Sequence, residues 1–345
     1  MPLFHSHSNS SFSPALDNYP LPSSAIRGLI PSMPDLQQTT FTIADLRSRA
    51  EGRGPMPDDV RLAVLGFPVA HSLSPAMQNA GLAALGLEAR YAKIECPPED
   101  LAEAVDRARA ANFLGLNLTI PHKFEALKIC TEVDDTARLL GSANTLLFDG
   151  RRTAGFNTDG PGLVRAIRDS FGMDLRDLRV MILGAGGGAG TAAALQCALE
   201  KCPRLVLVNR TMEKARDVAA RANQLLQSDR LKGPDDPVTV IPFETDLLRD
   251  QLARTDLVIN ATSLGMKRSD PPLIPAALLT PDLTVFDMIY RPAVTRLLED
   301  AQAAGARTAN GLSMLLHQGA LSLEVWTDRP APVDAMRAAL AKATA

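Results

Sequence analysis

The chain has 345 residues, of which 46% are hydrophobic and 22% charged, and its formal net charge is −3. This length allows two domains of ordinary size, and this composition allows each of them to bury a core. Nucleic acid is not expected as the main partner, because binding to its phosphates needs a basic surface. No apolar run approaches the roughly 20 residues that span a bilayer, so no membrane partner is expected either.

The N-terminal residues 1–58 differ in composition from the rest of the chain. The first forty are rich in Ser, Pro and Thr and carry few charges, and no basic start precedes an apolar core, so a secretory signal is not predicted. We expect a disordered extension over 1–58, with a short helix near residues 43–51. Four cysteines, at positions 96, 130, 197 and 202, form no C-x-x-C pair. They are expected to be reduced thiols of a cytoplasmic protein, with no metal bound.

Strands and helices alternate from Arg61 onwards. We expect strands over 61–66, 90–94 and 115–119, and helices that start at Ser74, at residue 99 and after Pro121. Ser74 is expected to cap its helix, because Pro75 follows in the first helical position. This order is typical of βαβ units with a mostly parallel sheet.

A second series of alternating elements begins near residue 161. Strands are expected over 179–183, 204–208, 238–242, 257–260 and 284–287, helices over 189–200 and 211–226, and a loop over 227–237. Two helices, 312–326 and 333–341, end the chain, with Pro330 and Pro332 between them. The sequence therefore predicts two α/β units, and a ligand between them would meet the carboxyl ends of both sheets.

A glycine-rich turn follows the strand 179–183 and precedes an alanine-rich helix. It reads Gly184, Ala185, Gly186, Gly187 and Gly188. Glycines in this context let the backbone approach a pyrophosphate, and the free N–H groups of the helix start favour its negative charge. The strand–turn–helix setting predicts a dinucleotide site.

The next strand ends at Asn209, Arg210 and Thr211, and Lys214 follows. An enzyme that uses NAD usually places a carboxylate there to bind the ribose 2′-hydroxyl. Arg210 and Lys214 instead attract a 2′-phosphate, and Thr211 offers a hydrogen bond to it. These residues favour NADP over NAD, although a solvated helix start would explain them too.

Three strings in the first unit carry polar side chains at the ends of predicted elements. Ser72 and Ser74 precede a helix and could face an anion, although a plain helix cap explains Ser74 equally well. Lys123 is expected at the start of a helix, where a positive charge is electrostatically misplaced; a surface lysine is the ordinary alternative. Asn144 and Asp159 belong to turn-rich strings that turn chemistry alone would explain.

Taken together, these strings resemble the shikimate dehydrogenase family over about residues 61–340. The shared motifs occur in the family's order. They are the serines before Pro75, Asn117-x-Thr119-x-Pro121-x-Lys123, Ala143-Asn144-Thr145, Asn157-Thr158-Asp159-x-x-Gly162, the glycine turn, Asn209-Arg210-Thr211, Asn260-Ala-Thr-Ser-x-Gly265-Met266, Asp287-Met288-x-Tyr290 and Gly311-Leu-x-Met-Leu-x-x-Gln318. The chain departs from the common pattern at Gln78, Gly190, Thr191 and Lys214.

The resemblance implies a fold of two α/β domains and NADPH-dependent reduction of 3-dehydroshikimate to shikimate, a step towards chorismate and the aromatic amino acids. A substrate-binding domain is expected over 59–160, a Rossmann-like NADP-binding domain over 161–311, and C-terminal helices that return to the first domain over 312–345. A hinge is expected near residues 160 and 311. A homodimer and a cytoplasmic location are compatible with the resemblance.

The resemblance also implies roles for individual residues. Lys123 and Asp159 would form the catalytic pair. Substrate would be bound by Ser72, Ser74, Thr119, Asn144, Asp159, Tyr290 and Gln318. NADP would be bound by Asp135, Gly184, Ala185, Gly186, Gly187, Gly188, Asn209, Arg210, Thr211, Lys214, Met288 and Gly311. Two alternatives stay open, namely a quinate/shikimate dehydrogenase that also uses NAD and a non-catalytic ligand sensor. The presence of both Lys123 and Asp159 favours catalysis over the sensor.

Overall fold

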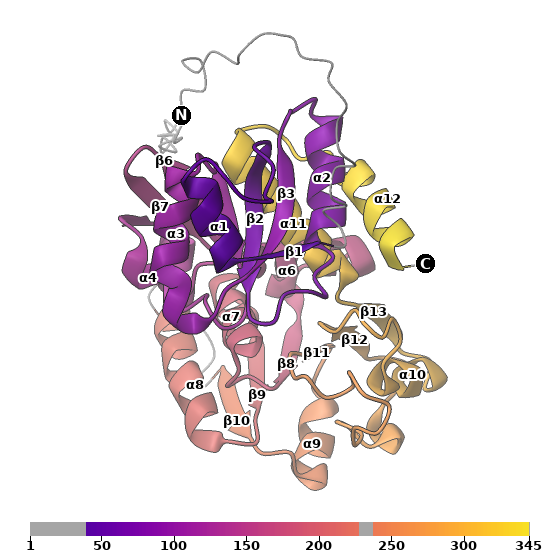
Figure 1. Cartoon of the computed structure of the whole chain (residues 1–345). Coiled ribbons are helices and arrows are strands. Elements are labelled where there is room, and N and C mark those ends of the chain that lie inside the picture. Colours follow the sequence, from indigo (N-terminus) through magenta and orange to yellow (C-terminus); the bar gives the residue numbers. More distant parts are fainter. Residues whose placement is uncertain (1–38, 228–236, 345) are drawn as a thin grey trace, which may run out of the picture.

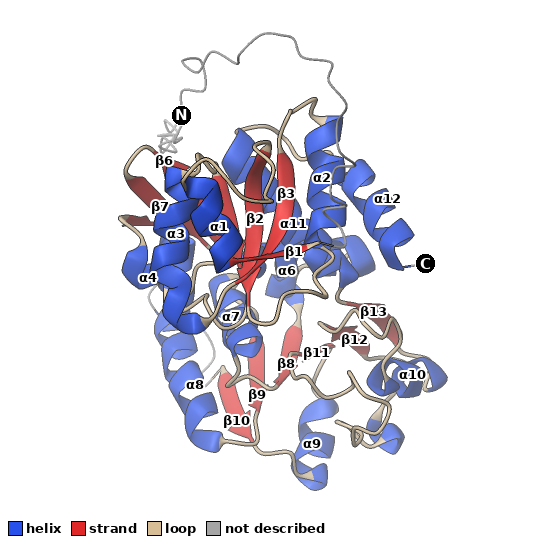
Figure 2. Ribbon diagram, in the orientation of Figure 1, coloured by secondary structure: helices blue, strands red, loops and turns tan. Residues whose placement is uncertain are grey.

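The computed structural model describes residues 39–227 and 237–344 and forms two sheets, one above the other in Figure 1. Predictions for residues 1–38, and for nearly all of the predicted loop at 227–237, lie outside the described residues. Figure 2 shows helices around both sheets, which is the α/β architecture that the sequence predicts. The strands and helices that were expected from residue 61 onwards are present, with ends shifted by a few residues.

The first sheet has seven strands in the order β1-β3-β2-β4-β6-β7-β5. All neighbouring pairs are parallel except those made by β6, which runs antiparallel to β4 and to β7. The sequence did not predict the β6–β7 hairpin, which turns at Gly150 and Arg151. The strands are β1 (Thr40–Thr42), β2 (Val60–Gly66), β3 (Arg90–Glu95), β4 (Gly115–Leu118), β5 (Glu132–Val133), β6 (Thr145–Asp149) and β7 (Arg152–Phe156).

Helices cover both faces of the first sheet and bury a separate apolar cluster on each side. One cluster joins the strands to α1 (Ile43–Ala50), α3 (Leu101–Ala110), α4 (Ala126–Ile129) and α5 (Asp135–Leu140). The other joins them to α2 (Ser74–Ala84), α11 (Leu312–Thr327) and α12 (Val333–Thr344). In Figure 1 the yellow helix α12 lies beside α2. The C-terminal helices thus return to the first sheet, as expected.

Residues 39–58 are folded, so the prediction of a disordered extension over 1–58 is wrong for the part that the structure describes. Strand β1 pairs with β3, and the side chains of Phe41 and Leu46 are buried in the first cluster. Helix α1 confirms the short helix expected near residues 43–51. The strand β1 was missed because three residues carry no readable periodicity, and its partner β3 lies far away in the sequence.

The second sheet has six strands, all parallel, in the order β10-β9-β8-β11-β12-β13. The chain starts at β8 and adds strands first on one side and then on the other, which creates a crevice outside the carboxyl ends of β8 and β11. The strands are β8 (Arg179–Leu183), β9 (Arg204–Val208), β10 (Val238–Ile241), β11 (Leu257–Asn260), β12 (Thr284–Asp287) and β13 (Arg307–Asn310).

Alternate residues of the central strands bury themselves on opposite faces of this sheet. Val180 and Ile182 point into a cluster with α6 (Asp159–Phe171), α7 (Gly188–Leu199) and α8 (Met212–Gln227). Met181 and Leu183 point into a cluster with α9 (Thr245–Leu252) and α10 (Arg296–Ala303). The period of two follows from the geometry of a strand.

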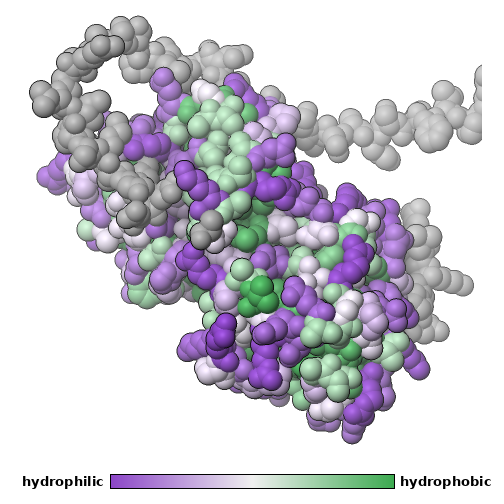
Figure 3. Space-filling model, turned by 90° about the vertical axis from the view of Figure 1, so that its right-hand side faces the viewer, coloured by the Kyte–Doolittle hydropathy of each residue, from purple (hydrophilic) through white to green (hydrophobic). Residues whose placement is uncertain are grey.

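Helix α6 connects the two sheets and packs against α11, so two long helices join the halves of the molecule. Figure 3 shows hydrophilic side chains over much of the visible face, with hydrophobic ones in separate small patches. Among the helices built from described residues, none has both the length and the apolar character that crossing a bilayer requires.

Candidate active site

A cavity of about 340 Å³ lies between the two sheets. The first half of the molecule and the second sheet's loops both contribute to its wall. Its lining includes Ser72, Ser74, Asn117, Thr119, Lys123, Asn144 and Asp159 from the first half, Met288, Tyr290 and Gly311 from the second, and Gln318 from α11. All the residues that the resemblance assigns to catalysis and substrate therefore face one space.

Lys123 and Asp159 form an ion pair at this cavity. The Lys123 Nζ lies 2.8 Å from the Asp159 Oδ2, and the two side chains are 29% and 13% exposed. Asp159 is the first residue of α6, where the helix dipole favours a carboxylate. Lys123 lies in the turn 121–125, not at a helix start as predicted, because α4 begins only at Ala126. Lys123 is therefore outside α4, and its ammonium group lies at the start of α6, where the Asp159 carboxylate offsets the positive end of that helix.

The two serines precede and open helix α2. The expected cap at Ser74 is wrong, since Leu73 is the N-cap residue and no side chain caps this helix. The Ser72 Oγ accepts a hydrogen bond from the Ser74 backbone N–H at 3.3 Å. The Ser74 side chain lines the cavity at the positive end of the helix dipole, and its hydroxyl is a hydrogen-bond partner of the buried Tyr91 phenol.

A buried network of amide hydrogen bonds fixes several side chains that line the cavity. The Asn144 Nδ2 donates to the Gln318 Oε1 at 3.3 Å and to the Thr158 hydroxyl at 2.9 Å, and its Oδ1 accepts from the Thr158 N–H at 2.7 Å. Asn117, to which the sequence assigned no separate role, donates to the Asn144 carbonyl at 3.1 Å. It also accepts from the Tyr91 hydroxyl at 2.8 Å. The network fixes the side chains of Asn144 and Gln318 relative to Asp159.

Tyr290 reaches the cavity from the loop that follows β12. Burial raises the pKa of its phenol, so the side chain stays a neutral hydrogen-bond donor at physiological pH. A neutral donor at the edge of a cavity that holds two serine hydroxyls suits a bound anion.

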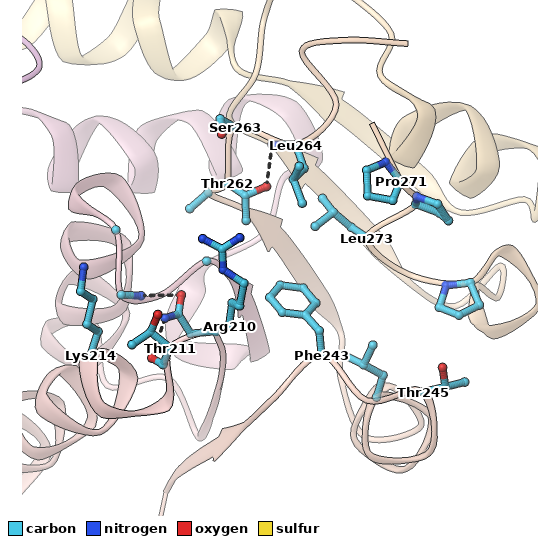
Figure 4. A pocket seen from close by; sticks show the side chains of 18 residues that line it. Arg210, Thr211, Lys214, Phe243, Thr245, Thr262, Ser263, Leu264, Pro271 and Leu273 are labelled. Atoms are coloured by element: carbon cyan, nitrogen blue, oxygen red, sulfur yellow. Dashed lines mark hydrogen bonds between the residues drawn. The ribbon is translucent and has the colours of Figure 1, made fainter. Parts of the chain in front are cut away.

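A second pocket, of about 780 Å³, lies outside the carboxyl ends of β8 and β9. Gly184, Gly186 and Gly187 line it together with Asn209, Arg210, Thr211 and Lys214. The Asn209 Oδ1 accepts from the Gly186 N–H at 3.2 Å, and its Nδ2 donates to the Thr211 carbonyl at 2.7 Å. Asn209 thus ties the glycine turn to the basic string that the sequence singled out. In Figure 4 the Arg210 side chain lies between Thr262 and Phe243.

The charges of this pocket fit a phosphorylated ligand. Among the described residues that line it are the cations of Arg210 and Lys214 and no carboxylate. The start of α7 connects it to the first cavity, because Gly187 lines the pocket and Ala189 lines the cavity. A dinucleotide with a 2′-phosphate therefore fits the donors present, with its pyrophosphate at the N–H groups of α7.

The structure places three predicted cofactor residues outside the lining of the pocket and the cavity. Ala185 is fully buried beneath the turn, Gly188 opens α7, and Asp135 is exposed at the start of α5. Sequence reasoning gave no role to Phe243 or to Thr262, Ser263 and Leu264, which line the pocket. The last three follow the end of β11, the strand next to β8, and that position was the available signal.

The cysteines at 96, 130, 197 and 202 are all free thiols, and burial raises the pKa of Cys96 to about 12 and that of Cys130 to about 11. Within the described ranges, no cluster of three or more His, Cys, Asp or Glu side chains is placed to hold a metal ion.

Comparisons with known proteins agree on one family. Residues 64–146 match the model of the shikimate dehydrogenase substrate binding domain, and residues 311–341 match that of the shikimate 5'-dehydrogenase C-terminal domain. The shikimate dehydrogenase (NADP(+)) of Methanopyrus kandleri is 41% identical over 281 residues, which cover 81% of this chain and 94% of that protein.

Solved structures give the same result. The Thermus thermophilus shikimate 5-dehydrogenase in complex with NADP(H) and shikimate has a TM-score of 0.72 and 35% identity, covering 82% of this chain and 99% of that one. Another shikimate dehydrogenase, in complex with NADP+, has a TM-score of 0.75 and 33% identity, covering 84% and 98%.

Proposed function

The chain belongs to the shikimate dehydrogenase family, and from this premise we propose how its residues carry out the family's reaction. The enzyme is an NADP-dependent oxidoreductase that reversibly reduces 3-dehydroshikimate to shikimate, a step in the synthesis of aromatic amino acids. The observation that carries the assignment of roles is the Lys123–Asp159 pair, which faces the cavity where both halves of the molecule meet.

Substrate binding is assigned to the side chains around the cavity. Ser72 and Ser74 bind the carboxylate of the substrate at the start of α2, and Tyr290 donates a further hydrogen bond to it from the loop after β12. Thr119, Asn144, Asp159 and Gln318 bind the ring hydroxyls. This division is supported by the position of Ser74 in the cavity wall at the start of α2 and by the hydrogen bonds that hold Asn144 and Gln318 in place.

Proton transfer is assigned to Lys123. Negative charge develops on the substrate's ketone oxygen during reduction, and the Lys123 ammonium stabilises this charge and supplies the proton. Asp159 orients the ammonium group through the 2.8 Å ion pair. In the reverse direction Lys123 accepts the proton of the alcohol.

Bound NADPH supplies the hydride. We assign its binding to Gly184–Gly188 with Ala185, to Asn209, Arg210, Thr211 and Lys214 at the 2′-phosphate, and to Met288 and Gly311 beside the cavity. Asp135, exposed on α5, is assigned to the edge of the cofactor site on the resemblance alone. The corresponding domains span 59–160 and 161–311, with C-terminal helices over 312–345. The enzyme is also proposed to be a homodimer and to be located in the cytoplasm. Sedimentation velocity tests the proposed dimer.

The first test removes the proton donor. Replacing Lys123 by Ala is expected to lower kcat by about 10²–10⁴-fold with a smaller change in KM, because proton transfer is lost while the substrate contacts remain. The matched control is Lys128→Ala, which removes an exposed lysine paired with Glu125 on the same segment. Unchanged turnover in Lys123→Ala, measured by absorbance of the reduced nicotinamide, would remove Lys123 from the mechanism.

The second test concerns the choice of substrate and cofactor. Wild-type enzyme is expected to oxidise shikimate with NADP in preference to quinate and in preference to NAD. Replacing Arg210 by Asp should raise the KM for NADP, because a carboxylate repels the 2′-phosphate. The kcat/KM with NADP, divided by that with NAD, should therefore fall. An unaltered ratio would contradict the role of Arg210. Equal activity with quinate and NAD in the wild type would favour the broader dehydrogenase.

A further inference from the structure

Two neighbouring loops of the second sheet line different parts of the ligand-binding region. The loop after β11 places Thr262, Ser263 and Leu264 in the wall of the larger pocket. The loop after β12 places Met288 and Tyr290 in the wall of the cavity between the sheets. Each loop starts at the last residue of its strand, Asn260 or Asp287, and these two residues are directly opposite in the parallel register.

Asn260 and Asp287 bond to each other and to their own loops. The Asn260 Nδ2 donates to the Asp287 Oδ1 at 2.9 Å and to the Leu264 carbonyl at 3.3 Å. The Asn260 Oδ1 accepts from the N–H and the hydroxyl of Thr262, at 2.9 and 2.8 Å. The Asp287 Oδ1 also accepts from the Ile289 N–H at 3.0 Å. A single buried pair thus holds the first residues of both loops.

Thr295 holds the far end of the second loop. Its hydroxyl donates to the Asp287 Oδ2 at 2.6 Å and caps helix α10. Thr295 also lies against the first loop, because a Cβ built on Gly265 would be 3.3 Å from the Thr295 Cβ. The two loops are therefore connected at their starts, by Asn260 and Asp287, and a second time where Thr295 lies against Gly265.

The chemistry of this group is unusual for a purely structural role. Asp287 and Asn260 are fully buried and Thr295 is 1% exposed. The donors to Asp287 are an amide, a hydroxyl and a backbone N–H, all neutral, and burial raises the pKa of its carboxyl. A carboxylate taken out of water with neutral partners is costly, and apolar side chains would fill the same space more cheaply.

We propose that Asp287, with Asn260 and Thr295, is a positioning residue that fixes the cofactor loop 261–265 and the substrate loop 288–290 relative to each other. It acts through Thr262 and Leu264 on the larger pocket and through Met288 and Tyr290 on the cavity, and it touches neither ligand itself. This inference rests on the proposed function for the identity of the two ligands. The carboxylate, with two acceptor oxygens and no donor, is the group that matches three converging donors.

The test replaces Asp287 by Asn, which keeps the size and places an NH₂ group against one of the donors. We expect the Kd for NADPH, from its fluorescence, and the KM for shikimate each to rise about tenfold, the loss typical of one hydrogen bond to a charged group. The matched control is Asp256→Asn, the same change beside the opposite end of β11, where the carboxylate binds Arg179. It should leave both constants unchanged even if it lowers Tm.

Two further variants separate positioning from general stability. Thr295→Val loses the hydroxyl and should raise the KM for shikimate above the wild-type value. Thr295→Ser keeps the hydroxyl and should have the KM of the wild type. Equal behaviour of these two variants, or Asp287→Asn with a lowered Tm and both ligand constants within twofold of wild type, would overturn the proposal. If the enzyme failed to turn over shikimate while Asp287→Asn still weakened NADPH binding, the proposed function would fail and the role in the cofactor loop would stand.

Discussion

At Gly190 the glycine-rich turn leaves no room for a side chain. A Cβ at this position would lie 2.2 Å from the Gly184 carbonyl oxygen and 2.8 Å from the Ala185 Cα, both backbone atoms. The sequence showed Gly190 only as a departure from the family's common pattern. The structure explains it, because the first turn of α7 packs directly against the turn that precedes it. Such a contact between backbones is not visible in residue spacing.

We predict that Gly190→Ala lowers the free energy of unfolding by about 1–3 kcal/mol and weakens NADPH binding, because the turn must shift to admit the methyl group. Thermal melts and NADPH titration measure the two effects. Gly187→Ala is the control for the melt, since its Cβ would meet the nearest atom at 3.5 Å, an ordinary contact. Equal melting temperatures for the two variants would contradict the steric argument.

The catalytic pair shows how far single residues can be interpreted from the sequence. On its own, Lys123 was best explained as a surface lysine and Asp159 as a turn residue. Only the ordered set of motifs assigned them to one site. Their ion pair joins residues 36 positions apart, and it forms because the turn after β4 and the start of α6 meet at the cavity. No local pattern encodes that proximity.

At the scale of elements, prediction succeeded where hydrophobic period and flanking residues agreed. The central strands β8, β11 and β12 have the predicted ends, because each is a short apolar run between polar residues. The helix expected after Pro121 is present, but its predicted start at Lys123 was wrong, because the turn 121–125 delays α4 to Ala126. The missed β1 and β13 are edge strands whose pairing depends on the neighbouring strand rather than on their own composition.

Helix α1 is held to α3 by an ion pair that should make its attachment pH-dependent. Arg47 binds Glu103 at 2.7 Å and lowers the pKa of this carboxyl from 4.5 to about 2. A lowered pKa stabilises the folded state above about pH 4.5, and this contribution is lost as the pH falls towards 2. Both side chains are partly exposed, so the contribution is small and screened by salt.

We therefore predict that Glu103→Gln melts at a lower temperature than wild type at pH 7 and that the difference shrinks between pH 4.5 and 2. Thermal melts of both proteins at low ionic strength over this range measure it. Glu125→Gln, which removes an exposed partner of Lys128, serves as the control. A difference that did not depend on pH would show that Glu103 contributes through packing rather than charge.

At the scale of the whole molecule, the two sheets direct their carboxyl ends at a common cleft, as the sequence predicted for two successive α/β units. The sequence also placed the last helices on the first unit, by resemblance rather than by pattern. Their apolar faces confirm that placement, because Met336 and Leu340 of α12 are buried against α2 and its neighbours. The same α2 carries Ser74, so the end of the chain supports the substrate side of the cleft.

We predict that Met336→Ala lowers the free energy of unfolding by about 2–5 kcal/mol. The Met336 side chain is fully buried, and it packs closely against the backbone of α2 at Gly81. Urea denaturation measures the loss. Met266→Ala is the matched control, because that methionine is 57% exposed. A similar stability for both variants would mean that α12 contributes little to the first unit.

The return of α11 and α12 also has a consequence for how the protein is made. Part of the apolar cluster over β2, β3 and α2 is supplied by α11 and α12, which follow all other described elements along the chain. The second sheet is complete at β13, before those helices emerge. The first half therefore completes this cluster only after the strands of the second sheet have been translated, so its apolar residues are open to chaperones during that time.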